Sequence, residues 1–216
     1  MTRAWQSSSR AAQRAALCTD CFSRIISDAR SERRRHAATS SRGAGITLWD
    51  AVSGATRGAY VAKDSDGVPH AALALEFAVA SRGAWLWAGG ERRLMAFDVS
   101  RPGAPVSVWQ PSEKEHQRGL LGAVATSAVR ADVVAAGSYA GSVGVYADGA
   151  HGRLEPQLVL AGHRGGGTGL AWSACGNYLY RGARRDGNII CWDVRAGGGA
   201  AGELYRLPRA AENNQK

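Results

Sequence analysis

Four similar segments recur along the chain at nearly constant spacing, and this repetition constrains the fold more than any other feature. Each segment is a run of six residues in which an aromatic residue stands last but one. The four are Gly45–Asp50, Arg93–Asp98, Ser142–Ala147 and Asn188–Asp193. Their aromatic residues, Trp49, Phe97, Tyr146 and Trp192, follow one another at intervals of 48, 49 and 46 residues. Repetition at such a period is typical of an array of one supersecondary unit.

Short β-type runs separated by turn residues fill the intervals between these segments, in place of patterns with a helical period. The runs are 72–77, 84–89, 106–109, 133–139, 158–160, 169–173 and 178–182. Four strands in each unit of about 45 residues match the blade of a β-propeller. The sequence therefore predicts an all-β fold with three complete blades, 72–110, 119–160 and 167–208, and the second half of another, 45–62.

The last unit carries the most specific motif. Gly162 and His163 open it, Asp186 lies in its middle hairpin turn, and Trp192 and Asp193 close its third strand. This pattern resembles the WD40 repeat, in which such a His and turn Asp are hydrogen bonded and the Trp packs between blades. The resemblance assigns His163 a structural role and makes Trp49, Asp50, Phe97, Asp98 and Tyr146 the equivalent repeat positions.

The second strand of a WD40 repeat supplies a Ser or Thr to that network, but here the chain reads Arg181-Gly182-Ala183-Arg184. The three earlier units lack the Gly-His pair, and the third has Tyr146-Ala147 in place of Trp-Asp. The network of the last unit is therefore expected to be incomplete or rebuilt, with Arg184 as one candidate replacement for the missing hydroxyl.

Residues 40–216 also resemble one particular group, the telomerase Cajal body protein family. The resemblance is carried by Ser40–Arg42 with Trp49–Ala51, Ala136–Tyr139, Gly144–Tyr146, Gly162–Gly166, Gly182–Asp186 and Cys191–Asp193. It implies a nuclear, non-enzymatic propeller that recognises a loop of small Cajal body RNAs, and of telomerase RNA, and targets their ribonucleoprotein particles to Cajal bodies. Guide RNAs that direct modification of spliceosomal RNA are the expected clients.

Members of this family close a ring of about seven blades, within the usual range for propellers. The chain would supply about three and a half of them, as an incomplete WD40-type β-propeller. Residues 212–216 resemble the entry to a further blade. A fragment or a truncated gene model is therefore expected, and a half-ring with open strand edges is expected to bind RNA poorly by itself.

Arginines near turns are the candidate RNA-binding residues. Arg184 and Arg185 lie at the hairpin turn before Asp186, where a guanidinium can fork onto phosphate or stack on an unpaired base. Arg118, Tyr139 and Arg164 are turn residues that could extend a basic and aromatic surface. The alternative is a generic WD40 protein–protein interaction scaffold without RNA specificity. A continuous surface of these residues favours RNA, and dispersal over different faces favours the scaffold.

The formal charge of +9 is concentrated near the beginning of the chain, where residues 1–42 hold nine Arg against Asp20, Asp28 and Glu32. Because the chain is rich in Arg, Ala and Gly, which GC-rich codons favour, the charge is compatible with RNA binding without establishing it. Residues 1–39 are expected to be a disordered basic leader. Arg33–Arg35 could serve there as a nuclear localisation patch, or be an artefact of the gene model.

Metal binding, catalysis and membrane insertion are not indicated. Cys18 and Cys21 have zinc-knuckle spacing, but a zinc site needs two further ligands and only His36 is near. The chain has no nucleophile elbow, phosphate loop or pair of coupled carboxylates, and no apolar run long enough to span a bilayer. Four cysteines without a disulfide framework suit a reducing compartment such as the nucleus. We expect no enzyme activity, cofactor, metal or small-molecule substrate.

Overall fold

Four antiparallel sheets make up the computed structural model, which describes residues 26–27, 36–41, 45–63, 70–111, 117–148, 154–163, 165–197 and 202–210. Each sheet consists of four strands that are consecutive in the sequence. The first two sheets contain β1 (Ile26–Ser27), β2 (His36–Ser41), β3 (Gly45–Asp50), β4 (Thr56–Tyr60), β5 (Ala74–Phe77), β6 (Trp85–Gly90), β7 (Arg93–Asp98) and β8 (Ser107–Trp109). The last two contain β9 (Leu121–Thr126), β10 (Val133–Ser138), β11 (Val143–Asp148), β12 (Leu154–Leu160), β13 (Gly167–Trp172), β14 (Tyr178–Ala183), β15 (Asn188–Asp193) and β16 (Glu203–Pro208).

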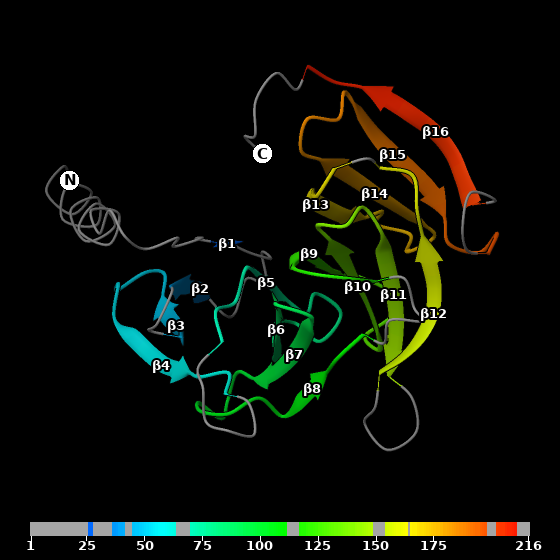
Figure 1. Ribbon diagram of the computed structural model, residues 1–216. Coiled ribbons are helices and arrows are strands. Elements are labelled where there is room, and N and C mark those ends of the chain that lie inside the picture. Colours follow the sequence, from blue (N-terminus) through cyan, green and yellow to red (C-terminus); the bar gives the residue numbers. More distant parts are fainter. Residues whose placement is uncertain are drawn as a thin grey trace, which may run out of the picture.

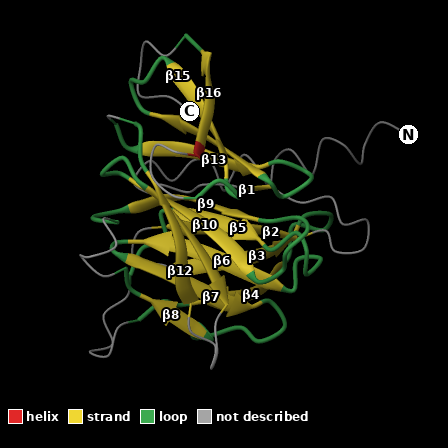
Figure 2. Ribbon diagram, turned by 90° about the vertical axis from the view of Figure 1, so that its right-hand side faces the viewer, coloured by secondary structure: helices red, strands yellow, loops and turns green. Residues whose placement is uncertain are grey.

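The sheets follow one another in chain order around an open arc (Figures 1 and 2). The inner strands connect them: β5 and β6 contact β9, β9 and β10 contact β13, and β2 contacts β5. The fourth strands β8, β12 and β16 lie on the outer rim (Figure 1). This arrangement is that of propeller blades around an axis.

A separate apolar cluster fills each of the three seams between neighbouring sheets. Leu48 and Tyr60 pack with Leu75 and Phe97 in the first seam, where the Tyr60 and Phe97 rings meet edge to face at 5.6 Å. The second seam contains Leu94, Leu121, Val134 and Tyr146, and the third contains Val145, Leu179 and Trp192. Since each sheet buries apolar side chains against the next, the seams stabilise the arc as a whole.

The four repeated segments form the third strand of every sheet, β3, β7, β11 and β15. The register toward the fourth strand shifts immediately before Trp49, Tyr146 and Trp192. Where Asp follows the aromatic residue, it caps the next turn: Oδ1 of Asp50, Asp98 and Asp193 accepts the backbone N–H two residues later, at 2.9, 2.8 and 2.9 Å. The repeat therefore specifies both packing and turn geometry.

The predicted all-β propeller is confirmed. The predicted runs and repeat segments agree with β5 to β8 and β10 to β15, although β12 begins four residues before its run, whereas β9, β16 and the beginning of the first sheet were not predicted as strands. That sheet has four strands, because β1 and β2 precede the expected half-blade. Strand β2 crosses the boundary expected between residues 39 and 40. Its sequence His-Ala-Ala-Thr-Ser-Ser has none of the Val, Ile or aromatic residues that mark a strand, but Ala38 and Ser40 are buried. The hypotheses for Cys18, Cys21 and Arg33–Arg35 concern residues outside the described ranges.

Candidate functional site

The turns that carry the predicted RNA-binding residues lie at one edge of the third and fourth sheets. Within an antiparallel sheet, the beginning of the first strand, the end of the second and the beginning of the third share an edge. Arg118 precedes β9, Tyr139 follows β10, and Arg184 and Arg185 follow β14. We call these four residues the arginine–tyrosine surface. Arg164, the fifth candidate, lies outside the described residues.

Arg184 and Tyr139 meet across the seam between the third and fourth sheets. The Arg184 guanidinium carbon lies 4.9 Å from the centre of the Tyr139 ring, and Nη2 donates to the Tyr139 hydroxyl at 3.2 Å. Gly122 and Gly166 leave room for the ring, since a Cβ at either position would lie within 3.1 Å of its atoms. Both side chains are half-buried. The contact presents an aromatic ring and a planar cation together, as in surfaces that stack unpaired bases.

Backbone contacts link Arg118 to the same turn. The Ser138 hydroxyl donates to the carbonyl of Arg118, and the Tyr139 N–H donates to the carbonyl of Leu120 at 2.8 Å. Arg118 is exposed, and with Arg92, Pro111, Gln117 and Gly119 it lines a cavity of about 150 Å³. Arg118, Tyr139 and Arg184 therefore belong to one continuous series of contacts.

Arg185 is exposed at the tip of the β14–β15 turn and has a left-handed backbone with φ of 52°. This conformation costs a side-chain-bearing residue about 1–2 kcal/mol. Arg118 and Arg185 have no ion-pair partner among the described residues, although the exposed Glu91 lies at the same edge, bridged to Leu120. The described part of this edge therefore carries arginines whose charge is not neutralised by contact.

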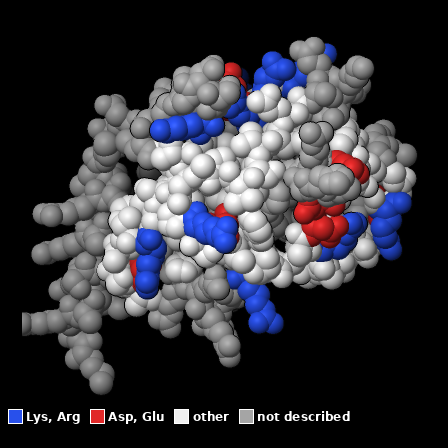
Figure 3. Space-filling view, turned by 90° about the horizontal axis from the view of Figure 1, so that it is seen from below, with Lys and Arg blue, Asp and Glu red and all other residues white. Residues whose placement is uncertain are grey.

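Three arginines at the opposite edge are paired, whereas Arg82 at that edge has no ion pair among the described residues. Asp50 contacts Arg57 at 2.5 Å, Asp132 contacts Arg130 at 2.8 Å, and Asp193 contacts Arg195 at 2.7 Å. Hydrogen bonds from Arg195 and its backbone hold the pKa of Asp193 below its usual range. Figure 3 shows one side of the molecule, on which several Lys and Arg side chains lie beside Asp or Glu. The side shown is thus of mixed charge rather than uniformly basic.

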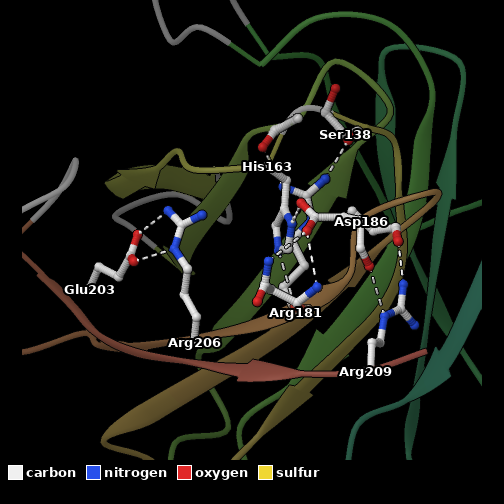
Figure 4. A network of polar contacts seen from close by, with 10 residues as sticks. Ser138, His163, Arg181, Asp186, Glu203, Arg206 and Arg209 are labelled. Atoms are coloured by element: carbon white, nitrogen blue, oxygen red, sulfur yellow. Dashed lines mark hydrogen bonds and ion pairs between the residues drawn. The ribbon is translucent and has the colours of Figure 1, made fainter. Parts of the chain in front are cut away.

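The predicted His–Asp pair lies beside Arg181 in the fourth sheet (Figure 4). His163 is buried, with Nδ1 2.7 Å from Oδ2 of Asp186 and Nε2 3.1 Å from the carbonyl oxygen of Arg181. Burial lowers the pKa of His163, although the hydrogen bond with Asp186 opposes this. Burial would raise the pKa of Asp186, but hydrogen bonds from His163 and from the backbone of Asn188 outweigh it and lower that pKa. The pair joins the loop before β13 to the β14–β15 turn.

The first sheet shows which partner the fourth sheet lacks. Trp49 Nε1 donates to the Thr39 hydroxyl at 2.8 Å, whereas the buried Trp192 Nε1 has no hydrogen-bond partner. Thr39 lies opposite Thr47, two residues before Trp49, and Arg181 lies opposite Ile190, two residues before Trp192. Arg181 therefore occupies the hydroxyl position, and the hypothesis that Arg184 replaces that hydroxyl does not match the register.

Arg181 is the residue that reasoning from sequence did not single out. It is 1% exposed, and burial lowers the pKa of its guanidinium to about 10, so it remains charged at neutral pH. Nη1 donates to the carbonyl of Gly141 at 2.5 Å and Nη2 to that of Ser138 at 2.8 Å (Figure 4). A signal in the sequence could have identified it: Arg181 lies on the second strand opposite Ile190, which is two residues before the aromatic Trp192 on the third strand.

The third sheet has a different hydrogen-bond network at the position of the His163–Asp186 pair. Gln117 lies four residues before β9, as His163 lies four residues before β13. The Gln117 amide donates to the carbonyl of Ala136, the register equivalent of Arg181, and accepts from the Tyr146 hydroxyl at 2.5 Å. A neutral amide and phenol thus replace the His–Asp pair, which accounts for the absence of Gly-His and Trp-Asp from this unit.

Among the described residues, no group of three or more His, Cys, Asp or Glu side chains could hold a metal ion. No helix in that part of the chain is long and apolar enough to cross a membrane.

These features define a WD40-type β-propeller protein. A chain in the crystal structure of the mitotic checkpoint complex superimposes with a TM-score of 0.59 and 17% identity, over 80% of this chain and 46% of that one, which supports the fold. No family model matches the sequence.

Curated relatives identify the family. Telomerase Cajal body protein 1 of Homo sapiens is 33% identical over 199 residues, which are 91% of this chain and 34% of the relative. The Drosophila melanogaster homologue is 28% identical over 174 residues, 79% of this chain and 30% of the relative. Guanine nucleotide-binding protein negative regulator 1 of Schizosaccharomyces pombe is 29% identical over 170 residues, which are 73% of this chain and 41% of the relative. The chain belongs to the telomerase Cajal body protein family and spans about a third of the length of its members named here.

Proposed function

We propose that the chain is a non-enzymatic RNA-binding scaffold of the nucleus, which recognises small Cajal body RNAs and telomerase RNA and targets their particles to Cajal bodies. The observation that carries this proposal is the stacking of Arg184 on Tyr139, with Arg118 and Arg185 at the same edge. Unpaired bases stack on aromatic rings and guanidinium planes, and arginine forks bind phosphate.

The unequal distribution of ion pairs supports this surface over the opposite edge. Arg57, Arg130 and Arg195 are already neutralised by Asp, whereas Arg118 and Arg185 have no such partner among the described residues. A phosphate that approaches the arginine–tyrosine surface therefore does not have to displace a carboxylate. Single-stranded RNA that combines phosphate contacts with one or two stacked bases fits this geometry best.

The proposal is tested by sequencing RNA cross-linked to the chain in cells, for the wild type and two double variants. Arg184→Ala with Arg185→Ala removes two charges from the arginine–tyrosine surface, and Arg130→Ala with Arg195→Ala removes two from the opposite edge. We expect enrichment of small Cajal body RNAs with the wild type and the second variant, weak because a half-ring is expected to bind RNA poorly, and loss of enrichment with the first. Equal enrichment for both variants, with both folded, would contradict the assignment of the surface.

The salt dependence of RNA affinity in solution tests the same proposal quantitatively. The logarithm of affinity for single-stranded RNA falls with the logarithm of salt concentration, with a slope of about −0.7 for each phosphate contact. Removal of Arg184 and Arg185 is expected to reduce the magnitude of this slope by about 1.4 if each contacts one phosphate. Removal of Arg130 and Arg195 is expected to leave it unchanged.

A generic protein-interaction scaffold is the competing function, and the outward face of the fourth sheet favours it. Tyr205 and Leu207 of β16 are 44% and 45% exposed, and Leu204 is 51% exposed. Exposed apolar residues on one strand are a feature of contact surfaces. A folded chain that captures no RNA in the cross-linking experiment would leave the scaffold as the better function.

A further inference from the structure

Burying Arg181 has an energetic cost that threonine or alanine at the same position would avoid. At its position, β2 of the first sheet has Thr39, β6 has Ala88 and β10 has Ala136. A threonine would accept from Trp192 Nε1, as Thr39 does from Trp49, and alanine would bury no charge. Arg181 instead buries a cation, leaves Trp192 Nε1 unsatisfied, and has its own buried Nε without a partner. Each of these is unfavourable for a sheet considered alone.

The contacts of Arg181 lie outside its own sheet. Its guanidinium reaches across the seam to the carbonyls of Ser138 and Gly141, which begin and end the turn between β10 and β11. Two carbonyls held by one planar group fix the separation between the two ends of the turn. The site is also closely packed, since a Cβ on Gly167 would lie 2.6 Å from the Arg181 side chain. The guanidinium therefore has little freedom to leave this position.

The turn held in this way carries Tyr139. Arg181 binds the backbone on both sides of the turn, while Arg184, three residues further along the same chain segment, stacks on the Tyr139 ring and binds its hydroxyl. The carbonyl oxygen of Arg181 lies 3.1 Å from Nε2 of His163, and Asp186 contacts the other ring nitrogen of His163 (Figure 4). The buried network around Arg181 and the half-buried stack of Arg184 on Tyr139 are thus connected across the same seam.

We propose that Arg181 is a positioning residue of the arginine–tyrosine surface: its bonds to Ser138 and Gly141 fix the turn that presents Tyr139 to Arg184. Where the surface binds RNA, as proposed above, affinity depends on this buried side chain although Arg181 itself touches no RNA. Rigid presentation of binding groups increases affinity because less conformational freedom is lost on binding.

Arg181→Thr is the informative substitution, because threonine supplies the hydroxyl that Trp192 lacks while the bonds to the turn are lost. Arg181→Met, which keeps an unbranched side chain without hydrogen bonds, serves as the second variant if the threonine variant fails to fold. Amide hydrogen exchange of residues 138–142 reports the turn without any RNA, and titration with single-stranded RNA at several salt concentrations reports binding.

The expected result is faster exchange in residues 138–142, about tenfold weaker RNA binding, equivalent to about 1.4 kcal/mol, and an unchanged salt slope. The unchanged slope separates loss of positioning from loss of a phosphate contact, since Arg184→Ala with Arg185→Ala reduces the slope. Exchange in a folded variant that equals the wild type would overturn the positioning role. Faster exchange with no RNA binding by the wild type would retain the positioning role and reject the RNA function. Faster exchange with undiminished RNA affinity would overturn the link between the turn and RNA.

Discussion

The first and fourth sheets place a tryptophan at the same register of the third strand, but they satisfy it differently. In the first sheet Trp49 donates to Thr39 of the neighbouring strand. In the fourth, Arg181 takes the place of Thr39 and directs its hydrogen bonds into the third sheet, so Trp192 is held by packing alone. The same repeat position can therefore make its polar contacts either within its own blade or with the neighbouring blade. Contacts with the neighbouring blade occur in the fourth sheet, where the arginine–tyrosine surface crosses the seam to the third.

The largest expected effect tests how the two tryptophans differ in packing. Trp192 is fully buried in the seam between the third and fourth sheets, whereas Trp49 is half-buried. Trp192→Ala is expected to reduce the free energy of unfolding by about 3–5 kcal/mol, the usual range for a buried aromatic residue. Trp49→Ala is expected to cost about 2 kcal/mol, because less apolar surface is buried. Urea unfolding followed by circular dichroism measures the loss of unfolding free energy for both variants. Equal losses would contradict the view that Trp192 stabilises the protein mainly by packing and Trp49 partly by its hydrogen bond.

A smaller effect, dependent on pH, tests the buried His–Asp pair of the fourth sheet against an exposed ion pair of the first. Asp186 faces His163 and lies near the Arg181 cation, and its side chain is 14% exposed. Since its pKa is lowered on folding, its contribution is fully present above the unfolded value of about 3.9 and is lost as the pH falls through the folded value. Asp186→Asn is expected to cost about 2 kcal/mol at pH 7, as for a hydrogen bond to a charged group.

The matched control is Asp50→Asn. Asp50 binds Arg57, whose side chain is 57% exposed, and its Oδ1 accepts from the backbone of Val52 and Ser53. The amide oxygen of asparagine can still accept those backbone bonds, so the substitution removes mainly the exposed ion pair, which contributes at most about 1 kcal/mol. Unfolding free energies at pH 7 and pH 3 are the measurement. The deficit of the Asp186 variant is expected to shrink at pH 3, because this pH lies below the unfolded value and part of the wild type's contribution is lost there. A deficit that is the same at both pH values would mean that the ionisation of Asp186 contributes nothing.

The sequence predicts those parts of the fourth sheet that repeat and misses those that arise at a seam. Trp192, Asp193 and the His163–Asp186 pair follow from spacing, because each acts within one unit. Arg181 does not, because Arg181-Gly182-Ala183-Arg184 resembles an ordinary basic turn until the register with Ile190 is known. Tyr139 and Arg184 were each candidates, but 45 residues separate them and only the packing of two sheets brings them together.

The first sheet presents the opposite difficulty. Thr39 and Ser40 lie in a strand of small and polar residues, which sequence alone gives no reason to place beside Trp49. The tertiary structure does so: Ala38 packs in the first seam, and the Ser40 hydroxyl donates to the carbonyl of Ala72 at 2.8 Å. Burial against a neighbouring sheet overrides weak β-propensity here.

The smallest expected effect concerns left-handed residues near the start of the third strand: Gly45 begins β3 in the first sheet, and Arg185 lies in the turn before β15 in the fourth. Gly45 has φ of 75° and Arg185 has φ of 52°. Arg185→Gly removes the left-handed strain but adds freedom to the unfolded chain, so a net stabilisation of about 0.5 kcal/mol is expected. Arg82→Gly, with φ of 55° in the turn before β6 at the opposite edge, is the matched control. If Arg185 is retained for its charge, both variants gain stability and only Arg185→Gly loses RNA affinity. Equal RNA affinity for the two would make the left-handed arginine at position 185 a feature of the turn alone.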